Sequence, residues 1–410
     1  MKILLLHDKG TATGGAELQM LALRRRLRER GHDARLLASR ATPVPGSHLL
    51  ADYNCFGTNS RLQVLSQTAN PSAYWTLRRV MRAFRPDVVH VRLFLWQLSP
   101  LILPLLADVP CLYQTAMYKA ICPVGTKTLP DGRPCQDAAG LACWRNRCLT
   151  PQSWSVLMLQ RRLWQRWHNV FDVTVALSET MKSMLEAWGV APVEVIYNGV
   201  PERPMRTPLA GPPTLGYAGR LVAEKGVDIL LQALAQVVRQ QPTTQLLLAG
   251  QGREQPQLQW LAEQLGIADR VHWLGHLPRE TLEQHFDTVW VQVVPSRWAE
   301  PFGNVSAEAM MRGTAVVASV VGGQTEIVCD GETGLLVPPG DADALAGALL
   351  SVLSRRDVAE RMGQAGRARA LACFSEVRCV DQFESLYQQL IRCSHPKSMQ
   401  RFSHGFNPRY

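Results

Sequence analysis

The sequence lacks an apolar run long enough to cross a membrane. Its longest apolar stretch, LSPLILPLLADVP at residues 98–110, carries two internal prolines and falls short of the roughly 18 residues that a spanning helix needs. The opening MKILLLHDKG has a lysine and a short apolar run but no small-residue cleavage site, so it suits a buried strand better than an export signal. We therefore expect a cytoplasmic protein.

Acidic residues are outnumbered in the first half of the chain. Residues 1–200 hold 24 Lys and Arg against 13 Asp and Glu, whereas residues 201–410 hold 20 against 21, so the whole net charge of +10 belongs to the first half. Five of these cations share one expected helix: Arg24, Arg25, Arg26, Arg28 and Arg30. Such charge suits peripheral contact with an anionic membrane at its inner face, or a phosphate-bearing substrate, while a solvated basic face is the plain alternative. Nucleic acid is not an expected partner, because no recognition motif accompanies the charge.

Several catalytic signatures are also missing. No Asp-x-Asp stands at an expected cleft position to hold a catalytic metal, and no lysine has a context that would carry pyridoxal, as a phosphorylase requires.

Charged residues make up only 19% of the chain and hydrophobic residues 46%. This is the composition of a soluble globular protein and excludes disorder as the main state.

What the sequence does contain is a repeated alternation of strands and helices. A chain of 410 residues is too long for one ordinary core, so two domains are expected. An apolar strand at 2–8, a glycine-rich loop, a helix that ends at Gly31 and a strand at 33–39 form the βαβ unit of a parallel sheet. Further strands are expected at 86–92, 109–114, 171–178 and 193–199.

A proline-rich break sets the domain boundaries. Residues 201–213 lack apolar periodicity, which is typical of a linker. They separate the first domain, residues 1–200, from residues 214–375, where the alternation restarts and predicts a second doubly wound domain. Residues 376–410 have helical spacing followed by a frayed tail. Two such domains leave a cleft between them, and in open α/β sheets ligands sit outside the carboxyl ends of the strands.

Two cations and several glycines lie at expected strand ends. In GYAGRLVAEKG, Gly219 and Arg220 follow a strand, and Lys225 precedes a helix whose free N–H groups favour anions. Gly14 and Gly15, in TGGAEL, lie at the first strand-to-helix turn, where glycine lets a ligand approach the backbone. A diphosphate would suit these positions, and ordinary surface residues on loops are the alternative.

Two carboxylates flank the turn in PSRWAEPFGNVSAEAM at residues 295–310. Glu300 lies in the turn, and Glu308 lies about one and a half turns into the helix that follows. A carboxylate accepts hydrogen bonds from hydroxyls and can be bidentate to a vicinal diol. Two of them beside a helix N-terminus could therefore hold two sugars, one on each side of a phosphate group.

Together these stretches resemble the retaining glycosyltransferases of family 4, the glycosyl transferases of group 1. The matching elements fall in order across roughly residues 1–375, and their joint spacing is specific where each alone is not. They are GGAE (14–17), YNGV (197–200), GRLVAEKG (219–226), the two glutamates with PFGN (301–304), and GGQTEIV (322–328). The resemblance implies the GT-B fold, in which two Rossmann-like doubly wound domains face a central cleft, the first binding the acceptor and the second the donor nucleotide-sugar.

Carried over residue by residue, the resemblance implies a role for each motif. Arg220 and Lys225 would hold the donor diphosphate, Glu308 the ribose hydroxyls and Glu300 the transferred sugar, which makes Glu300, Arg220 and Lys225 the catalytic residues. The remaining donor-binding residues would be Gly14, Gly15, Gly219, Gly250, His276, Leu277, Pro301, Phe302, Gly303 and Asn304. The donor would be a UDP- or GDP-sugar, and no catalytic metal is expected, because cations and a helix N-terminus stabilise the charge that builds on the leaving diphosphate.

The chain departs from this family at one position. Many members that carry ICP, here Ile121 to Pro123, have a His-Asp pair about six residues before the cysteine, and that histidine helps position the donor sugar. Ala116 and Met117 occupy the pair in this sequence. Either another residue, such as Tyr118 or His90, takes over the contact, or the activity is altered.

Four cysteines cluster in a loop-like insertion at residues 122–148. Cys122, Cys135, Cys143 and Cys148 are metal ligands more often than disulfides in a cytoplasmic protein, so they could hold a structural zinc. They lack the CxxC pairs of a zinc ribbon, and reduced thiols in a loop are the equal alternative. Related sequences lead us to expect the insertion over the acceptor side of the cleft.

The stretch RRLWQRWHNVF at residues 161–171 fits either a helix in a membrane interface or a core helix with a solvated arginine face. We favour the core helix.

The predicted function is transfer of a sugar from a nucleotide-sugar to a lipid-linked or polymeric glycan in cell-surface polysaccharide synthesis. The alternatives are a nucleotide-sugar epimerase of the same architecture and a non-catalytic glycan- or nucleotide-binding relative.

Overall fold

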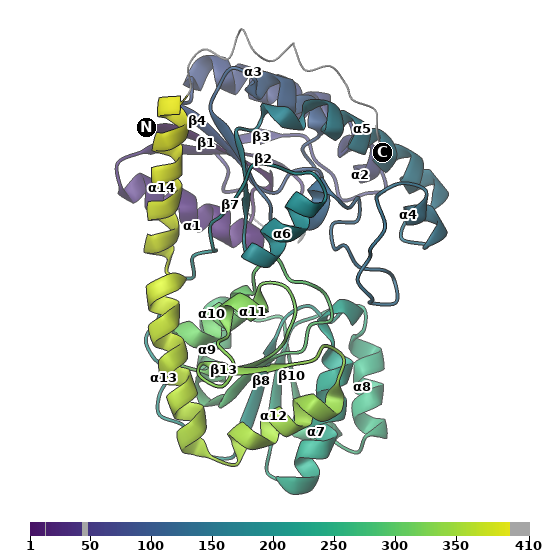
Figure 1. The fold of residues 1–410 in the computed structure, drawn as a ribbon, viewed down its shortest axis with the longest axis vertical. Helices are drawn as coiled ribbons and strands as arrows, with labels where there is room; N and C mark the ends of the chain where they lie inside the picture. The colour runs from purple at the N-terminus through teal and green to yellow at the C-terminus, as the bar shows by residue number, and fades with distance from the viewer. Residues whose placement is uncertain (13, 43–47, 394–410) are drawn as a thin grey trace.

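The computed structural model describes residues 1–12, 14–42 and 48–393. This part of the chain forms two domains, each built on a parallel sheet with helices packed on its faces (Figure 1). The first sheet has seven strands in the order β3-β2-β1-β4-β5-β6-β7, and the second has six in the order β10-β9-β8-β11-β12-β13. In both, the strand order reverses beside the first strand, so the predicted pair of doubly wound α/β domains is confirmed.

The N-terminal domain follows the predicted alternation of strands and helices. Its strands are β1 (Lys2–Lys9), β2 (Asp33–Ser39), β3 (Tyr53–Cys55), β4 (Val88–Val91), β5 (Cys111–Gln114), β6 (Val173–Ala176) and β7 (Val193–Val195). Its α-helices are α1 (Gly15–Glu29), α2 (Gln63–Ser66), α3 (Pro71–Phe84), α4 (Ala142–Arg145), α5 (Pro151–Trp167) and α6 (Glu179–Ala187). Short 3-10 helices are η1 (Pro100–Leu106), η2 (Tyr118–Ala120) and η3 (His168–Val170).

The C-terminal domain repeats the pattern after an irregular segment. Its strands are β8 (Thr214–Ala218), β9 (Gln245–Ala249), β10 (Val271–Gly275), β11 (Val291–Val294), β12 (Ala315–Ser319) and β13 (Gly334–Val337). Its α-helices are α7 (Val227–Gln240), α8 (Gln255–Gln264), α9 (Arg279–His285), α10 (Asn304–Met311), α11 (Gln324–Ile327), α12 (Ala342–Leu353), α13 (Arg356–Cys373) and α14 (Glu376–Cys393). Its 3-10 helices are η4 (Ala223–Lys225), η5 (Ala268–Arg270) and η6 (Phe286–Thr288).

The central strands are mostly apolar because helices cover both faces of each sheet. Residues 3–8 of β1 are all buried, and β1 pairs on one side with β2, Leu4 opposite Arg35, and on the other with β4, Leu4 opposite Val89. In the second sheet Val291 of β11 pairs with Leu215 of β8. No helix in the described ranges is both long and apolar enough to span a membrane.

The last helix returns to the first domain. Figure 1 shows α13 in the C-terminal domain and α14 running on beside the N-terminal sheet. Val380, Phe383 and Tyr387 of α14 share a buried cluster with Ile3 and Leu5 of β1. The periodicity predicted this helix but not its partner, and the predicted tail after Cys393 lies outside the described residues.

The two chain crossings between the domains touch each other. Val200 donates its N–H to the Phe374 carbonyl at 2.7 Å, and Glu376 donates to the Val200 carbonyl at 3.1 Å. A Cβ on Gly199 would lie 2.7 Å from Cα of Glu376, so only glycine permits this approach. The hinge between the domains therefore consists of paired backbone segments.

Candidate active site

The loops that follow the strands of both sheets line one cleft of about 730 Å³. From the N-terminal domain, Gly15 follows β1, Arg92 follows β4 and Ala116 follows β5. From the C-terminal domain the lining includes most of the predicted donor residues: Lys225, His276, Leu277, Glu300, Pro301, Phe302, Gly303, Asn304 and Glu308. The cleft thus lies where doubly wound sheets bind ligands.

Lys225 and Glu300 form an ion pair in the wall of the cleft. The Lys225 Nζ lies 2.8 Å from the Glu300 Oε1, and the Ser296 hydroxyl donates a second hydrogen bond to the same oxygen. Burial alone would raise the pKa of Glu300, but the Lys225 charge, these two hydrogen bonds and the nearby charge of Arg220 outweigh it and lower the pKa below its usual value. Glu300 is therefore held as a carboxylate.

Glycines hold the two loops that carry this pair. Gly226, after Lys225, has a φ of +66°, and a Cβ there would lie 2.1 Å from the Pro295 carbonyl oxygen. Gly322 has a φ of +54°, and its Cβ would lie 2.4 Å from the Glu300 carbonyl oxygen. The N–H of Gly323 donates to that same oxygen at 2.8 Å. The GGQTEIV segment therefore supports the backbone of Glu300 from behind.

The first turn of α10 faces the glycine loop of the other domain. Gly303 (φ +136°) lies just before α10, and Asn304 begins it. A Cβ on Gly15 would lie 3.3 Å from the Asn304 Nδ2, so the predicted donor residues of the two domains meet here. The N–H groups at the start of α10 lie at the cleft, where they can donate to an anion.

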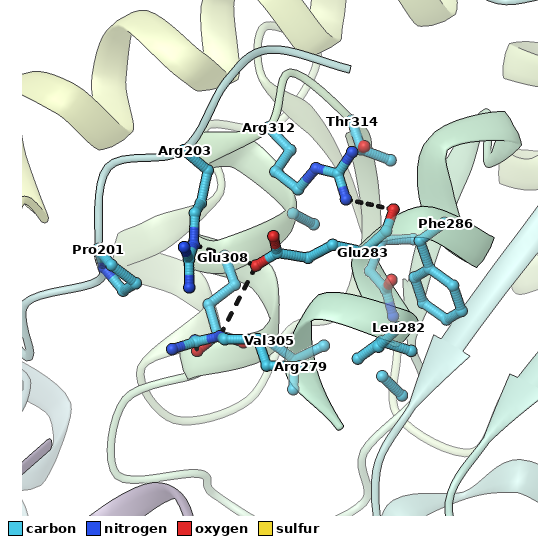
Figure 2. Close-up of a pocket in the computed structure, with 13 residues that line it drawn as sticks. Pro201, Arg203, Arg279, Leu282, Glu283, Phe286, Val305, Glu308, Arg312 and Thr314 are labelled. Carbon is cyan, nitrogen blue, oxygen red and sulfur yellow. Dashed lines mark hydrogen bonds and ion pairs between the residues drawn. The ribbon is translucent and has the colours of Figure 1, made fainter. Parts of the chain in front are cut away.

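Glu308, on the same helix, is paired with Arg279, a residue that no sequence pattern singles out. The Arg279 guanidinium contacts the Glu308 carboxylate, and its Nε also lies 3.8 Å from the Glu283 Oε1 (Figure 2). Removal of water around Glu308 raises its pKa above the usual value, although Arg279 opposes the shift. The carboxylate predicted to bind ribose is thus occupied by a neighbouring cation.

A second, smaller cavity of about 60 Å³ lies beneath α9 and shares Glu308 and Arg279 with the cleft. Figure 2 shows Arg203, Glu283 and Arg312 around it. The Arg203 Nε lies 3.1 Å from the Glu283 Oε1. α9 contributes no fully buried residue, so it covers this cavity without packing into a core.

Four predicted donor residues do not line the cleft. The Arg220 side chain is 62% exposed and pairs with Glu224, NH2 to Oε1, at 3.4 Å, although it lies close enough to lower the pKa of Glu300. Gly219 and Gly250 pack against each other, since a Cβ on Gly250 would lie 1.8 Å from the Gly219 carbonyl oxygen. Gly14 precedes α1, next to the Glu17 carboxylate.

Neither candidate for the missing histidine contact reaches the cleft lining. Ala116 lines the cleft itself. His90 is fully buried, with its Nδ1 2.6 Å from the Tyr387 hydroxyl and its Nε2 3.0 Å from the Gln114 Oε1, and burial lowers its pKa to about 3. Tyr118 is also fully buried, and its hydroxyl has no hydrogen-bond partner in the described part of the chain.

Sequence reasoning also missed a polar chain that links the domains. Buried Arg92 donates to the Asn198 Oδ1 at 3.0 Å, and the Asn198 Nδ2 donates to the Asn304 Oδ1 at 3.0 Å. Burial lowers the pKa of Arg92 to about 10. The available signal was a cation at the carboxyl end of the strand expected at 86–92, at the edge where ligands bind.

Glu326 makes a second inter-domain link, from the GGQTEIV segment of the C-terminal domain. It accepts from the Glu179 and Thr180 N–H groups, both at 2.8 Å, and from the Tyr197 hydroxyl at 3.1 Å. The first turn of α6 in the N-terminal domain is therefore capped by a carboxylate from the other domain.

The structural zinc site stays a prediction that the described residues do not display. No group of three or more His, Cys, Asp or Glu among them could hold a metal ion. Cys135 and Cys148 make weak contacts to backbone oxygens, of Asp137 at 3.9 Å and Asn146 at 3.8 Å, while Cys122 is buried behind η2 and Cys143 lies on α4. Burial raises the pKa of Cys148 to about 11, and the charges of Cys143, Cys135 and Cys122 add to the shift, so the four thiols are neighbours.

Comparisons with known families account for nearly the whole chain. Residues 205–369 match the family described as glycosyl transferases group 1, and residues 14–199 match the glycosyl transferase 4-like domain. Mycobacterium tuberculosis glycogen synthase is 37% identical over 190 residues, 45% of this chain and 46% of the relative. A D-inositol 3-phosphate glycosyltransferase from Geodermatophilus obscurus is 38% identical over 180 residues, 42% and 39%. The matches thus span under half the length of these relatives.

Solved structures resemble the chain along almost its full length. Sucrose-phosphate synthase from Thermosynechococcus elongatus has a TM-score of 0.73 at 24% identity, covering 96% of this chain and 99% of that one. Anabaena HepE, solved in complex with UDP-glucose, has a TM-score of 0.67 at 22% identity, covering 95% and 100%. These likenesses identify the two-domain arrangement as the GT-B fold.

Proposed function

Because the chain belongs to the glycosyl transferases of group 1, we propose that it moves a sugar from a nucleotide-sugar to a glycan acceptor, with retention at the anomeric carbon. The observation that carries the proposal is the shared wall of the cleft. Lys225, Glu300, the start of α10 and Glu308 lie on that wall within one cavity. Their order along it fits a sugar, a diphosphate and a nucleoside.

Lys225 and Glu300 would act on opposite sides of the bond that breaks, Glu300 on the sugar and Lys225 on the diphosphate. Glu300 would accept hydrogen bonds from the hydroxyls of the transferred sugar. As the bond between the anomeric carbon and the diphosphate oxygen breaks, negative charge builds on that oxygen, and Lys225 with the N–H groups of α10 would stabilise it more than the intact donor. Arg220 would add its charge after leaving Glu224. We expect no catalytic metal, because these groups supply the positive charge.

Retention sets the path of the proton. In a retaining transfer, the acceptor hydroxyl bonds to the anomeric carbon on the same face that the diphosphate leaves. The hydroxyl therefore lies beside the departing oxygen. That oxygen is then the base nearest to the hydroxyl proton and takes it up. The chain's own residues need only hold the two partners in place, so the transfer needs no side-chain base.

The donor and the acceptor are proposed by class. The donor is a UDP- or GDP-sugar, and the UDP-glucose complex of HepE, which shares the fold, supports uridine. Glu308 would bind the ribose diol once Arg279 has released it. The acceptor is a lipid-linked or polymeric glycan of cell-surface polysaccharide synthesis, supported by the basic N-terminal domain and its buried Arg92.

One observation favours a second candidate, a non-catalytic nucleotide- or glycan-binding protein. Ala116 places a methyl group on the cleft wall where relatives with the ICP sequence carry histidine. Such a protein would bind donors without turnover. It would also release no nucleoside diphosphate with any acceptor.

The test is release of nucleoside diphosphate from a panel of UDP- and GDP-sugars, with and without lipid-linked glycans. We expect turnover of one donor, loss of it in Glu300→Gln and Lys225→Met, and no loss in Glu332→Gln, an exposed acid of the same domain. An NMR spectrum of the product with an inverted anomeric centre would refute retention. Epimerised nucleotide-sugar would identify an epimerase, and binding without turnover would identify the non-catalytic alternative.

A further inference from the structure

The positive charge of the protein is concentrated in one stretch of the N-terminal domain. Residues 53–171 hold 14 Lys and Arg against 4 Asp and Glu, a difference that equals the net charge of +10 of the whole chain. This stretch contains α2, α3, α4 and α5. Neither α3 nor α5 contains an acidic residue.

One face of α3 combines a tryptophan with arginines. Trp75, Arg79 and Arg82 are spaced four and three residues apart, so they lie on one side of the helix, and all three are exposed. Arg78 lies over the Trp75 ring, 5.1 Å from its centre. The opposite side of the helix, with Leu77, Val80 and Phe84, is buried. No residue in the described part of the chain covers the exposed side, so it can meet a partner.

One face of α5 repeats the arrangement. Leu159, Arg162 and Arg166 are spaced three and four residues apart and are exposed. Trp164, on the opposite side, packs against the rings of Phe94 and Tyr113 in the core. The RRLWQRW segment is thus a core helix whose arginines and one leucine face outward.

These faces belong to one surface. α3 and α5 both pack against η1, and Figure 1 shows them along the edge of the N-terminal domain that faces away from the C-terminal domain. α2 rests on α5, where the Gln160 Nε2 donates to the Gln67 carbonyl at 2.6 Å. α2 and the residue before it add Leu65 and Leu62, both more than half exposed. We call the exposed residues of α2, α3 and α5, with Leu62, the outer face.

We propose that the outer face binds the surface of an anionic lipid bilayer. Trp75, Leu62, Leu65 and Leu159 enter the boundary between headgroups and acyl chains, and the arginines pair with the lipid phosphates. Arginines alone would be explained by solvation, but solvation gives no reason for four large apolar side chains, each more than half exposed, among them. Alternating arginines and apolar groups are what an anionic interface binds.

The proposal goes beyond the transfer reaction and does not depend on it. Nucleic acid would also attract the arginines, but it would gain nothing from Leu62, Leu65 and Leu159. Each arginine near an anionic surface strengthens binding roughly fivefold, so the loss of two should weaken binding at least about 25-fold. Salt should weaken binding as well, because it screens this attraction.

The test is sedimentation of the full chain with phosphatidylcholine vesicles that contain or lack phosphatidylglycerol. Arg79→Glu with Arg82→Glu should weaken binding to the anionic vesicles at least about 25-fold, and Trp75→Ala should weaken it severalfold. The matched controls lie in the C-terminal domain. Trp260→Ala is the control for Trp75→Ala, since the two tryptophans are 58% and 60% exposed. Arg355→Glu with Arg361→Glu, both at exposed positions, is the control for the arginine variant. These controls should bind as the unchanged protein does.

Further variants, a competitor and an activity assay make each outcome decisive. Arg79→Lys with Arg82→Lys should retain binding, which gives a result even if the glutamate variant fails to fold. Equal sedimentation with both vesicle types, or equal losses in the outer-face and control variants, overturns the proposal. Competition with duplex DNA is a further test. If DNA displaces the protein from the vesicles, and does so equally well for Trp75→Ala, the proposal is overturned and the face is assigned to nucleic acid. Donor turnover without vesicles should be unaffected in every variant, so failure here is distinguishable from failure of the proposed transferase.

Discussion

Replacing Lys225 by methionine tests whether the ion pair in the cleft exists in solution and what it does there. The substitution keeps most of the side-chain volume and removes the charge. It leaves the Glu300 carboxylate with the Ser296 hydroxyl as its nearest donor. In the unchanged protein the Lys225 and Glu300 side chains are only 17% and 11% exposed, and the pair lies at 2.8 Å.

The expected loss of stability follows from this burial. Removing one partner of a fully buried pair costs about 3–5 kcal/mol. Because both side chains line an open cleft and Glu300 keeps a hydrogen bond, we expect about 2–3 kcal/mol for Lys225→Met. Changing Glu300→Gln as well removes the unpaired charge, so the double variant should be more stable than Lys225→Met, with a coupling energy of about 1–3 kcal/mol. Urea unfolding of the four proteins measures each value.

The pH dependence has a definite sign. The pKa of Glu300 is lowered in the folded protein, so its ion pair contributes stability above the ordinary glutamate pKa of 4.5, and that contribution is lost as the pH falls through the lowered value. In Lys225→Met, only the Ser296 hydrogen bond and the charge of Arg220 oppose burial, so we expect the pKa of Glu300 to rise. That variant should therefore gain stability, relative to the unchanged protein, as the pH falls below neutral.

Activity separates the structural role from the catalytic one. Loss of a group that stabilises developing charge costs about 10²–10³ in kcat, and the double variant should not recover it although it recovers stability. The exposed pair Arg361–Asp357 is the control, for which we expect no measurable coupling. A Lys225→Met protein that unfolds at the same urea concentration as the unchanged protein, or that keeps full turnover, would refute the reasoning.

Three further predictions concern the rest of the site. Donor affinity should fall as the pH drops through the raised pKa of Glu308. Arg279→Gln removes the cation that opposes this shift, so it should move the midpoint of the fall in affinity to higher pH. Calorimetric titrations that give the same midpoint for both proteins would contradict this. Glu326→Ala should cost about 1–2 kcal/mol, as loss of a helix cap does, and should speed hydrogen exchange at the start of α6, whereas unchanged exchange would rule out the cap. Gly303→Ala should cost about 2–3 kcal/mol because its φ is +136°, and an unchanged melting temperature would show that the turn differs.

Much of the fold was predictable because its signals are local. Continuous apolar runs, such as the one in β1, mark strands covered on both faces, and the proline-rich break at 201–213 separates two runs of alternation. The partner of α14 was not predictable. Apolar spacing shows that Phe383 and Tyr387 share a helix face, but it does not say that this face packs on the sheet of the first domain rather than the second.

The candidate site divides in the same way. Lys225, Glu300 and Glu308 could be selected because each lies in the loop after a strand or in the helix that this loop enters, and parallel sheets bring those positions together. Arg279 could not, since it lies on a short helix without buried residues, and its contact with Glu308 depends on how that helix lies. Arg220 was selected for its charge, but its side chain takes the rotamer that pairs with Glu224, which no sequence pattern encodes.

The two buried cations of the cleft differ in how their charge is balanced, and this difference bears on where the second substrate binds. Lys225 is paired with Glu300, so their charges balance on the donor side of the cleft. Arg92, across the cleft, donates to neutral Asn198, and its Nε has no hydrogen-bond partner among the described residues. Burial lowers its pKa to about 10, although the nearby Glu17 carboxylate opposes the shift. A cation that is costly to bury gains most from an anion that arrives with a ligand. This supports our proposal of a phosphate-bearing acceptor over a neutral sugar, and a neutral glycan that turns over as fast as its diphosphate-linked form would remove this support.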